Sequence, residues 1–434
     1  MSLAPALWAA ADAVSTFRVL DLDGESLDAL ARRRLSALLQ HVARHNTFWA
    51  QRLNEAGLEW KDPLLQRDPY RVLAALPPVS KQELRQAGAT ALDAGRVARG
   101  WYSSTSSGST GEPFRVYYEP RAWATLKQLV KLRARRACGV QVTDRVAVLD
   151  AVVPSSPTRL GRWTRISVLQ PAPAMARALA AFAPDVIYGL PSALLEVARV
   201  LDRRGDGPGI FALFTSGELL DHTTRETLTA AFDAPVYDVY GTSETKEIAW
   251  ECPEGGMHVN ADVVRLEVLD DSGNPLPPEV EGDLVATLLV NRAMPLLRYR
   301  TGDRGTLLAE SCPCGRSSPL VGVVTGRAAD VLVLRGGHRV SPYTLTCALE
   351  RIEGVLRYQV SQLDLGRVRV RAIVEAAVDR DAVAASVRHG LRLAVPFLDA
   401  DVEFVDRFPR GPRAKFRVVQ PLQADAGVAA PSFV

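Results

Sequence analysis

The chain contains 434 residues, of which 47% are hydrophobic and 23% charged, so it can bury a large core and should form more than one domain. Its 52 basic and 49 acidic residues leave a formal net charge of only +3, and no long block of one sign occurs along the sequence. This balance argues against a nucleic acid or a membrane as the main partner.

The N-terminus and the cysteines bear on the cellular compartment. The first residues, "MSLAPALWAAADAVSTF", are apolar but lack a basic n-region and are interrupted by Asp12, so no signal peptide is predicted. No apolar run approaches the length of a membrane-spanning helix. Five cysteines are a sparse usage that suits a reducing cytoplasm, where clustered cysteines hold a metal more often than they form disulfides. We therefore expect a cytoplasmic protein.

In chain order, the sequence predicts helices first and then an α/β arrangement. Residues 26–58 have the apolar spacing of one or two helices. A strand at 114–119 follows a loop rich in serine and glycine, and residues 121–140 are predicted to form the next helix. Short apolar segments then alternate with helices at 192–205 and 223–232. This alternation predicts a largely parallel sheet whose ligands lie beyond the strand ends, with strands at 145–153, 185–191, 210–218 and 235–244.

From about Asp262 the pattern changes to strands of alternating polarity. Residues 263–290 contain two such strands around the turn "DDSGNP". A second, smaller unit is predicted to begin near Asp330 and to run to the end of the chain, with a frayed tail at 423–434. The sequence therefore predicts an α/β protein of two unequal domains.

The loop "SSTSSGSTGEP" at residues 103–113 allows two interpretations. Segments rich in serine and glycine are commonly flexible linkers. Alternatively, the glycines let the backbone turn its N–H groups toward an anion, and the hydroxyls add donors, so that the loop cradles phosphates. The loop alone does not decide between these two interpretations.

Five further motifs follow the loop in order: "TSGE" (215–218), "YGTSE" (240–244), "YRTGD" (299–303), "GRAADVLVLRGGHRVSP" (from 326) and "PRGPRAKFRVV" (from 409). With the loop, with "LLQHVARHNTFWAQRLNEAG" and with "CPCGR", this ordered set resembles the adenylate-forming superfamily of acyl-CoA synthetases, most closely its phenylacetate-CoA ligase-like branch, over nearly the whole chain. The resemblance implies an α/β fold with mixed and parallel sheets. A large N-terminal domain at 1–327 would bind nucleotide and acyl group, and a small α+β C-terminal domain at 328–434 would be mobile.

The resemblance also implies binding of ATP and Mg²⁺. Glu244 would hold Mg²⁺, a cation that prefers oxygen ligands, and Thr242 would contact the α-phosphate; taken alone, Glu244 reads as a solvated turn residue. Asp303 would accept hydrogen bonds from two ribose hydroxyls, or else cap a turn. Arg300 and Arg327 either lie near the phosphates or are ordinary surface arginines. The resemblance further implies that Tyr240, next to Gly241, stacks on the adenine, and that Gly217 and Glu218 lie at the adenine edge. The residues implied to surround the β- and γ-phosphates are Ser106, Ser107, Gly108, Ser109, Thr110 and Gly111.

Three positions depart from the pattern of the resembled family. Many relatives have lysine before the proline of the phosphate loop, where this chain has Glu112. Lys415 stands where the family keeps the lysine that neutralises charge as the carboxylate attacks the α-phosphorus, but it lacks the usual preceding glycine. A solvated lysine is the alternative, with Arg413 as the substitute. Ala329 occupies the usual hinge position, so the pivot is either shifted to Asp330 or altered.

Three cysteines and one histidine lie in two turn-rich segments and form a Cys₃His set that suits a structural Zn²⁺. The Cys-x-Cys spacing is atypical for a zinc knuckle, but members of the resembled branch carry such a cluster; buried free thiols are the alternative. The four predicted zinc ligands are Cys252, His258, Cys312 and Cys314, whereas the other two cysteines, Cys138 and Cys347, are predicted to lie in the core.

The acid is expected at the strand ends, near Tyr188, Gly189, Thr215 and Ser216. An aromatic or apolar acid is favoured by the possible wall of Trp163, Phe182, Tyr188 and Phe214. The implied reaction activates a carboxylic acid to an acyl-AMP with release of pyrophosphate, and a thiol, best assigned to coenzyme A, then displaces AMP. A carrier protein, an amine or a hydroxyl as acceptor, a homodimer, and a degenerate nucleotide-binding protein without turnover remain open.

Overall fold

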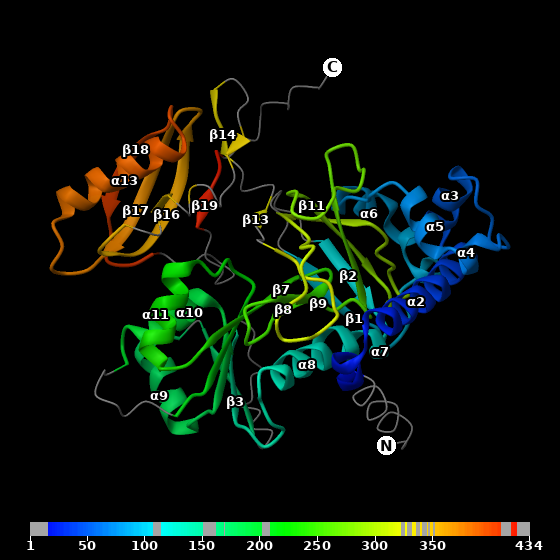
Figure 1. Ribbon diagram of the computed structural model, residues 1–434, viewed down its shortest axis with the longest axis horizontal. Helices are drawn as coiled ribbons and strands as arrows, with labels where there is room; N and C mark the ends of the chain where they lie inside the picture. Colours follow the sequence, from blue (N-terminus) through cyan, green and yellow to red (C-terminus); the bar gives the residue numbers. More distant parts are fainter. Residues whose placement is uncertain are drawn as a thin grey trace.

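The fold is an α/β arrangement of several sheets (Figure 1), as the sequence predicts. None of the described helices is both long enough and apolar enough to cross a membrane. The computed structural model describes residues 16–106, 114–150, 162–168, 170–201, 209–322, 326–327, 332–335, 339–340, 345, 348–349, 352–408 and 418–422.

One long helix and several short ones make up the N-terminal segment. The stretch at 26–58 folds as two helices because Asn46 ends the first, and its side chain accepts a hydrogen bond from the backbone N–H of Trp49 (3.0 Å), which caps the second. Farther on, Ser80 and Glu83 form a reciprocal capping box that starts a helix at Lys81. The elements are η1 (Val19–Asp21), α2 (Gly24–His45), α3 (Thr47–Glu55), α4 (Leu64–Arg67), α5 (Pro69–Ala75), α6 (Lys81–Ala87), η2 (Gly88–Ala91) and η3 (Asp93–Gly95).

A hairpin and an interrupted helix follow. The first two strands pair antiparallel, with Tyr102 opposite Tyr118. The helix predicted at 121–140 is present, but a π-helical turn interrupts it, a feature often found at functional sites. These elements are β1 (Tyr102–Ser106), β2 (Phe114–Tyr118), α7 (Pro120–Ala124), η4 (Thr125–Leu129) and α8 (Val130–Ala137).

The central feature is a seven-stranded sheet with the strand order β4-β3-β5-β6-β7-β8-β9. The five strands from β4 to β7 in this order are parallel, and β8 and β9 continue the sheet antiparallel. The prediction of a largely parallel sheet is therefore confirmed. Its elements are β3 (Val146–Asp150), β4 (Trp163–Ser167), α9 (Ala172–Phe182), β5 (Val186–Gly189), α10 (Pro191–Ala198), β6 (Ala212–Ser216), α11 (His222–Phe232), β7 (Val236–Thr242), β8 (Lys246–Glu251) and β9 (Met257–Val259).

An antiparallel sheet and a C-terminal unit complete the chain. The change of pattern after Asp262 corresponds to the sheet β10 (Val264–Leu269), β11 (Gly282–Leu288), β12 (Tyr299–Gly305) and β13 (Gly326–Arg327). Figure 1 shows the C-terminal strands β16 to β18 and helix α13 gathered as a separate body beside α10 and α11. The C-terminal elements are β14 (Leu332–Val333), β15 (Arg339–Val340), β16 (Val355–Asp364), β17 (Arg367–Val374), α13 (Arg380–Ala394), β18 (Asp399–Phe404) and β19 (Val419–Gln420).

Separate apolar cores hold these layers together. Helices α9, α10 and α11 bury Leu179, Leu194 and Leu228 against one face of the seven-stranded sheet. Helix α8 covers the other face, where Ala134 packs in a cluster with Phe214. The N-terminal helices share a core with the antiparallel sheet, and the C-terminal strands have a core of their own. The domain boundary at 327/328 stays a prediction.

A buried ion pair anchors α8. Arg133, which is 2% exposed, donates two hydrogen bonds to the carboxylate of Asp262 (2.7 and 2.9 Å), which is 1% exposed. Arg34 of α2 donates to the same carboxylate at 2.9 Å. Burial alone would raise the pKa of Asp262, but Arg133 and Arg34 together lower it below the ordinary value. Its contribution to stability is therefore present at neutral pH and is lost as the pH falls below about 4, the unfolded pKa of Asp.

We expect Asp262→Asn to lower the free energy of unfolding by about 3–5 kcal/mol, because it leaves a buried guanidinium without its counter-charge. Urea unfolding followed by tryptophan fluorescence measures the change. Asp28→Asn is the matched control, since Asp28 pairs with Arg32 at 3.5 Å on the surface, and such pairs are worth at most about 1 kcal/mol. Equal losses in the two variants would contradict the anchoring role of Asp262.

Candidate active site

The carboxyl ends of three neighbouring parallel strands bring the predicted acyl-site residues together. Tyr188 and Gly189 end β5, and Thr215 and Ser216 end β6, with Gly189 paired to Thr215 in register. Ser216 in turn pairs with Val239 of β7. Ligands of open α/β sheets bind at this edge. The structure therefore places these side chains along the edge where the resemblance expects the acid.

The motif "YGTSE" forms a tight turn between β7 and β8. A Cβ atom at Gly241 would overlap the carbonyl oxygen of Lys246, so only glycine allows the two strands this approach. The hydroxyl of Thr242 accepts hydrogen bonds from the backbone N–H groups of Glu244 (3.2 Å) and Thr245 (3.1 Å). The turn therefore fixes the direction in which Glu244 leaves the sheet.

Glu244 points inward and is 5% exposed. Its Oε1 lies 2.7 Å from Nζ of Lys81 and accepts a hydrogen bond from the hydroxyl of Tyr299 (3.3 Å). The hydroxyl of Tyr118 donates to the backbone carbonyl of Glu244. Burial, reinforced by the Glu244 charge, raises the pKa of both tyrosines, so both remain neutral donors. A buried carboxylate of this kind offers the oxygen ligands that Mg²⁺ prefers.

Lys81 is a candidate functional residue that the sequence motifs did not reveal. It comes from α6, far from "YGTSE" in the chain, and reaches Glu244 because the capping box of Ser80 and Glu83 starts the helix directly before it. The capping pattern was the available signal in the sequence, but it predicts a helix start and says nothing of the partner.

The nucleotide residues predicted in "YRTGD" face the same turn. Asp303 of β12 accepts a hydrogen bond from the hydroxyl of Tyr240 (2.9 Å), and its backbone pairs with that of Arg327 in β13. Arg300 instead forms an ion pair with Asp283 of β11, which fits the interpretation as an ordinary arginine. Contact of Asp303 with a ribose stays a prediction.

Two residues of "TSGE" already have partners inside the fold. Thr215 donates to the carboxylate of Asp238 (2.8 Å), whose pKa burial raises to about 6. The carboxylate of Glu218 accepts hydrogen bonds from the backbone N–H and the hydroxyl of Ser192, both at 2.9 Å, at the start of α10. Gly217 has φ +87°, a conformation that favours glycine. A role of Gly217 and Glu218 at the adenine edge stays a prediction.

The proposed aromatic wall is partly wrong. Phe182 packs in the core beneath α9 to α11, whereas Tyr188 and Phe214 belong to the cluster on the α8 side of the sheet. Phe214 is sealed between Tyr188 and Tyr237, with ring centroids 6.4 and 5.4 Å away. Phe182 is the last residue of α9 and packs on the sheet face that α9 covers, opposite the face covered by α8. Of the four proposed rings, Trp163 and Tyr188 lie beside the Arg135 guanidinium of α8, with ring centroids 4.5 and 5.3 Å away.

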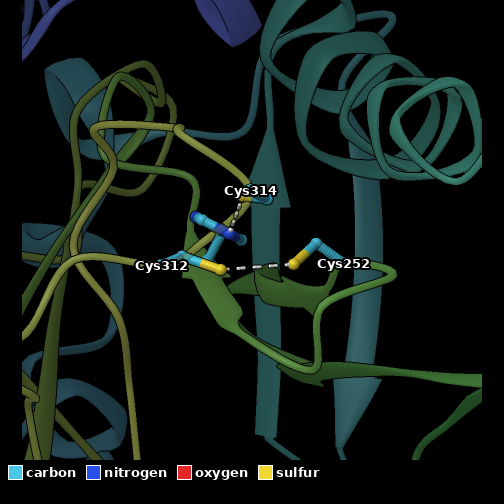
Figure 2. A group of neighbouring side chains, drawn as sticks. Cys252, Cys312 and Cys314 are labelled. Atoms are coloured by element: carbon cyan, nitrogen blue, oxygen red, sulfur yellow. Dashed lines mark hydrogen bonds between the residues drawn. The ribbon is translucent and has the colours of Figure 1, made fainter.

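Three cysteines and a histidine converge beside β9, as predicted. Their ligand atoms all lie within 4.8 Å of one another. Sγ of Cys252 lies 3.5 Å from Sγ of Cys312, a contact drawn as a dashed line in Figure 2. Sγ of Cys314 lies 3.1 Å from Nε2 of His258. A Cβ at Gly256 would lie 2.6 Å from Sγ of Cys312, so glycine keeps this space open. Nδ1 of His258 meets the hydroxyl of Ser318 at 2.9 Å, which orients the ring.

This donor set fits a tetrahedral Zn²⁺. Cys138 is buried in the core next to α8, as predicted. Several other predictions lie outside the described residues: Ser107, Gly108, Ser109, Thr110, Gly111, Glu112, Ala329, Asp330, Cys347, Arg413 and Lys415, together with the side chains of Ser106 and Arg327.

Comparison with known proteins identifies the family. No protein-family model matches the chain. It is 30% identical over 376 residues to the phenylacetate-coenzyme A ligase of Thermus thermophilus, covering 78% of this chain and 79% of that one. It is 28% identical over 416 residues to the phenylacetate-coenzyme A ligase of Aromatoleum evansii, covering 85% and 88%.

Solved structures agree on the fold. A 2-hydroxyisobutyryl-CoA ligase in the postadenylation state matches with a TM-score of 0.77 at 20% identity, covering 94% of this chain and 91% of that chain. A benzoate CoA ligase from Burkholderia xenovorans matches with a TM-score of 0.55 at 20% identity, covering 70% and 66%. The chain therefore belongs to the phenylacetate-coenzyme A ligase family of the adenylate-forming superfamily.

Proposed function

We propose that this protein is an AMP-forming acid–CoA ligase. A carboxylate oxygen of the acid attacks the α-phosphorus of ATP and pyrophosphate leaves, which gives an acyl adenylate. The thiol of coenzyme A then attacks the acyl carbon, a thioester forms, and AMP leaves. The observation that carries the proposal is the meeting of Tyr240, Thr242, Glu244 and Asp303 at one sheet edge in a member of this family.

The residues at this edge suit the first half-reaction. A carboxylate is a poor electrophile, so positive charge around the phosphates is needed to accelerate its adenylation. Glu244 would hold Mg²⁺, which supplies part of that charge when bound. Lys81, at 2.7 Å from Glu244, neutralises the buried carboxylate and adds a cation on the same side. Thr242 keeps the turn closed and would contact the α-phosphate.

Other parts of the proposal rest on the family pattern. The loop at 107–111 would surround the β- and γ-phosphates, and Lys415 would approach the α-phosphate from the C-terminal domain at 328–434. Coenzyme A is taken as the acceptor because the relatives named above are coenzyme A ligases. Rotation of the small domain would then exchange Lys415 for the thiol.

We further propose that Cys252, His258, Cys312 and Cys314 hold one structural Zn²⁺. The ion would tie the β8–β9 hairpin to the segment that carries Cys312, and a closed Cys₃His site leaves no open position for chemistry. Support comes from the convergence of the four ligand atoms within 4.8 Å and from the orienting hydrogen bond on His258.

Exchange of labelled pyrophosphate into ATP tests the adenylation step, because it requires the acid but no acceptor. We expect one class of carboxylic acid to support exchange, and Glu244→Gln to slow it by about 10²–10³-fold, the usual loss when one charge-stabilising group is removed. Glu226→Gln is the control, since Glu226 lies exposed on α11. An unchanged rate in Glu244→Gln would contradict its role, and ATP binding without exchange for any acid would contradict the ligase.

Metal analysis tests the zinc proposal. We expect about one zinc ion per chain in protein purified without chelator, loss of this zinc in Cys314→Ser, and a lower thermal unfolding temperature, because structural zinc contributes folding energy. Cys138→Ser keeps the four ligands and serves as the control. Protein that contains no zinc, or Cys314→Ser that retains a full complement, would refute the site.

A further inference from the structure

One face of the interrupted helix carries three basic residues four positions apart: Lys127, Lys131 and Arg135. Residues at this spacing lie above one another on a helix. Nζ of Lys127 lies 4.6 Å from the ring centroid of Trp123, and Nζ of Lys131 lies 4.4 Å from that of Tyr188. The Arg135 guanidinium lies 5.3 Å from the Tyr188 ring. This basic face of the helix therefore lies beside Tyr188, near the carboxyl end of β5.

Two further residues extend this basic face. The Arg135 guanidinium also lies 4.5 Å from the ring of Trp163 in β4. At the other end, Nζ of Lys246 lies 5.2 Å from the Trp123 ring and donates to the hydroxyl of Ser104 and the carbonyl of Ser243, both at 2.5 Å. We call Lys127, Lys131, Arg135 and Lys246, with the rings of Trp123, Trp163 and Tyr188, the basic pocket face.

Acidic neighbours do not balance these four cations. Glu247 pairs with Lys131 at 3.0 Å, and Asp150 acts electrostatically on Lys127, but Arg165 opposes that effect. Glu244, which also faces Lys246, is paired with Lys81. Burial, the largest cause in each case, lowers the pKa of Lys127, lowers that of Lys246 to about 7 and lowers that of Arg135 to about 10. Lys131 differs, because burial acts to lower its pKa but Glu247 raises it above the ordinary value. Lys127, Lys246 and Arg135 therefore lack the stabilisation that an anion would give them.

Among the four cations of the basic pocket face, Arg135 is the least exposed. It is only 4% exposed, and in the described part of the chain its Nε has no hydrogen-bond partner. Glu247, the carboxylate that acts on it, is engaged by Lys131. Buried charges are ordinarily paired, since an unpaired one costs much of the stability of a fold. A guanidinium held in this way between two aromatic rings is ready to receive a planar anion by two hydrogen bonds.

We propose that the acid activated by this enzyme carries a second carboxylate, which Arg135 binds at the end of the acyl site away from the "YGTSE" turn. This inference rests on the proposed ligase function. The reacting carboxylate lies at the "YGTSE" end, beside Thr242 and Lys246, and the short aromatic or aliphatic body of the acid lies among Trp123, Trp163 and Tyr188. Arg135 is eight residues beyond Lys127, about 12 Å along a helix, so it serves the acid rather than the phosphates of ATP.

Matched pairs of acids test the proposal in pyrophosphate exchange. The pairs are 4-carboxyphenylacetate with phenylacetate, and adipate with hexanoate. For at least one pair we expect kcat/KM for the diacid to exceed that for the monoacid by about 10- to 100-fold, because charge-assisted hydrogen bonds of this kind give such factors. Similar values in both pairs, or a preference for the monoacids, would overturn the second carboxylate and leave the ligase intact.

Substitutions of Arg135 test whether this residue causes the preference for the diacid. Arg135→Met should lower kcat/KM for the diacid by about 10- to 100-fold more than for the monoacid, mainly through KM, because the arginine contacts the distal carboxylate that only the diacid carries. Arg135→Lys should recover part of the loss. The control is Arg136→Met, an exposed neighbour on the same helix. Equal losses for diacid and monoacid in a folded Arg135→Met protein would indicate a structural role and overturn the assignment.

Calorimetric titration separates this inference from the proposed function. If no acid supports exchange although ATP binds, the ligase proposal fails. Titration of 4-carboxyphenylacetate and phenylacetate into the protein then still decides the second carboxylate. Binding of the diacid alone, lost in Arg135→Met, supports it; equal binding of both acids, or none of the diacid, overturns it.

Discussion

The buried ion pair of Arg133 and Asp262 sets the position of the helix on which both halves of the site depend. Successive residues of an α-helix turn by about 100°, so Arg133 points away from Lys131 and Arg135 by about 200°. One face of α8 is thus fixed against α2 and the segment before β10, and the opposite face must lie against the seven-stranded sheet. The ion pair of Arg133 and Asp262 therefore also fixes the position of the basic pocket face.

A second constraint acts at the turn between β7 and β8. Because Gly241 lets the strands approach, Glu244 and Lys246 leave the same turn in different directions. Glu244 reaches α6 through Lys81, and Lys246 reaches β1 through Ser104, directly before the loop at 107–111. The proposed phosphate side and the proposed acyl side of the site therefore share one hydrogen-bonded turn. A displacement of this turn would disturb both, which explains why so many side-chain hydrogen bonds close it.

Much of this arrangement could be predicted from the sequence, but not all. Buried strands such as β5 and β6 are recognisable in the sequence as short apolar runs. The ordered motifs predict the sheet edge with Thr242 and Asp303, and the spacing of cysteine and histidine predicts the separate cluster at the other end of β8. Pairing across the chain is harder, because the capping pattern around Lys81 carries no information about Glu244. The basic residues of α8 were missed for a physical reason: lysine and arginine are rarely buried, so a basic helix reads as solvated. Phe182 was misplaced because apolar periodicity does not say which face of a sheet a ring covers.

Burying unpaired cations costs stability, and the fold must offset that cost elsewhere. Arg133 and Arg34 share one buried carboxylate on the anchored side of α8, where every charge is satisfied by short hydrogen bonds. On the pocket side, Arg135 and Lys246 are held with few counter-charges. One face of α8 thus stabilises the fold through a buried ion pair, and the opposite face buries positive charge with few counter-charges. A buried polar group left without a partner in a native protein calls for an explanation, and a functional role is one such explanation. The difference between its two faces, rather than its overall basic character, marks α8 as part of the site.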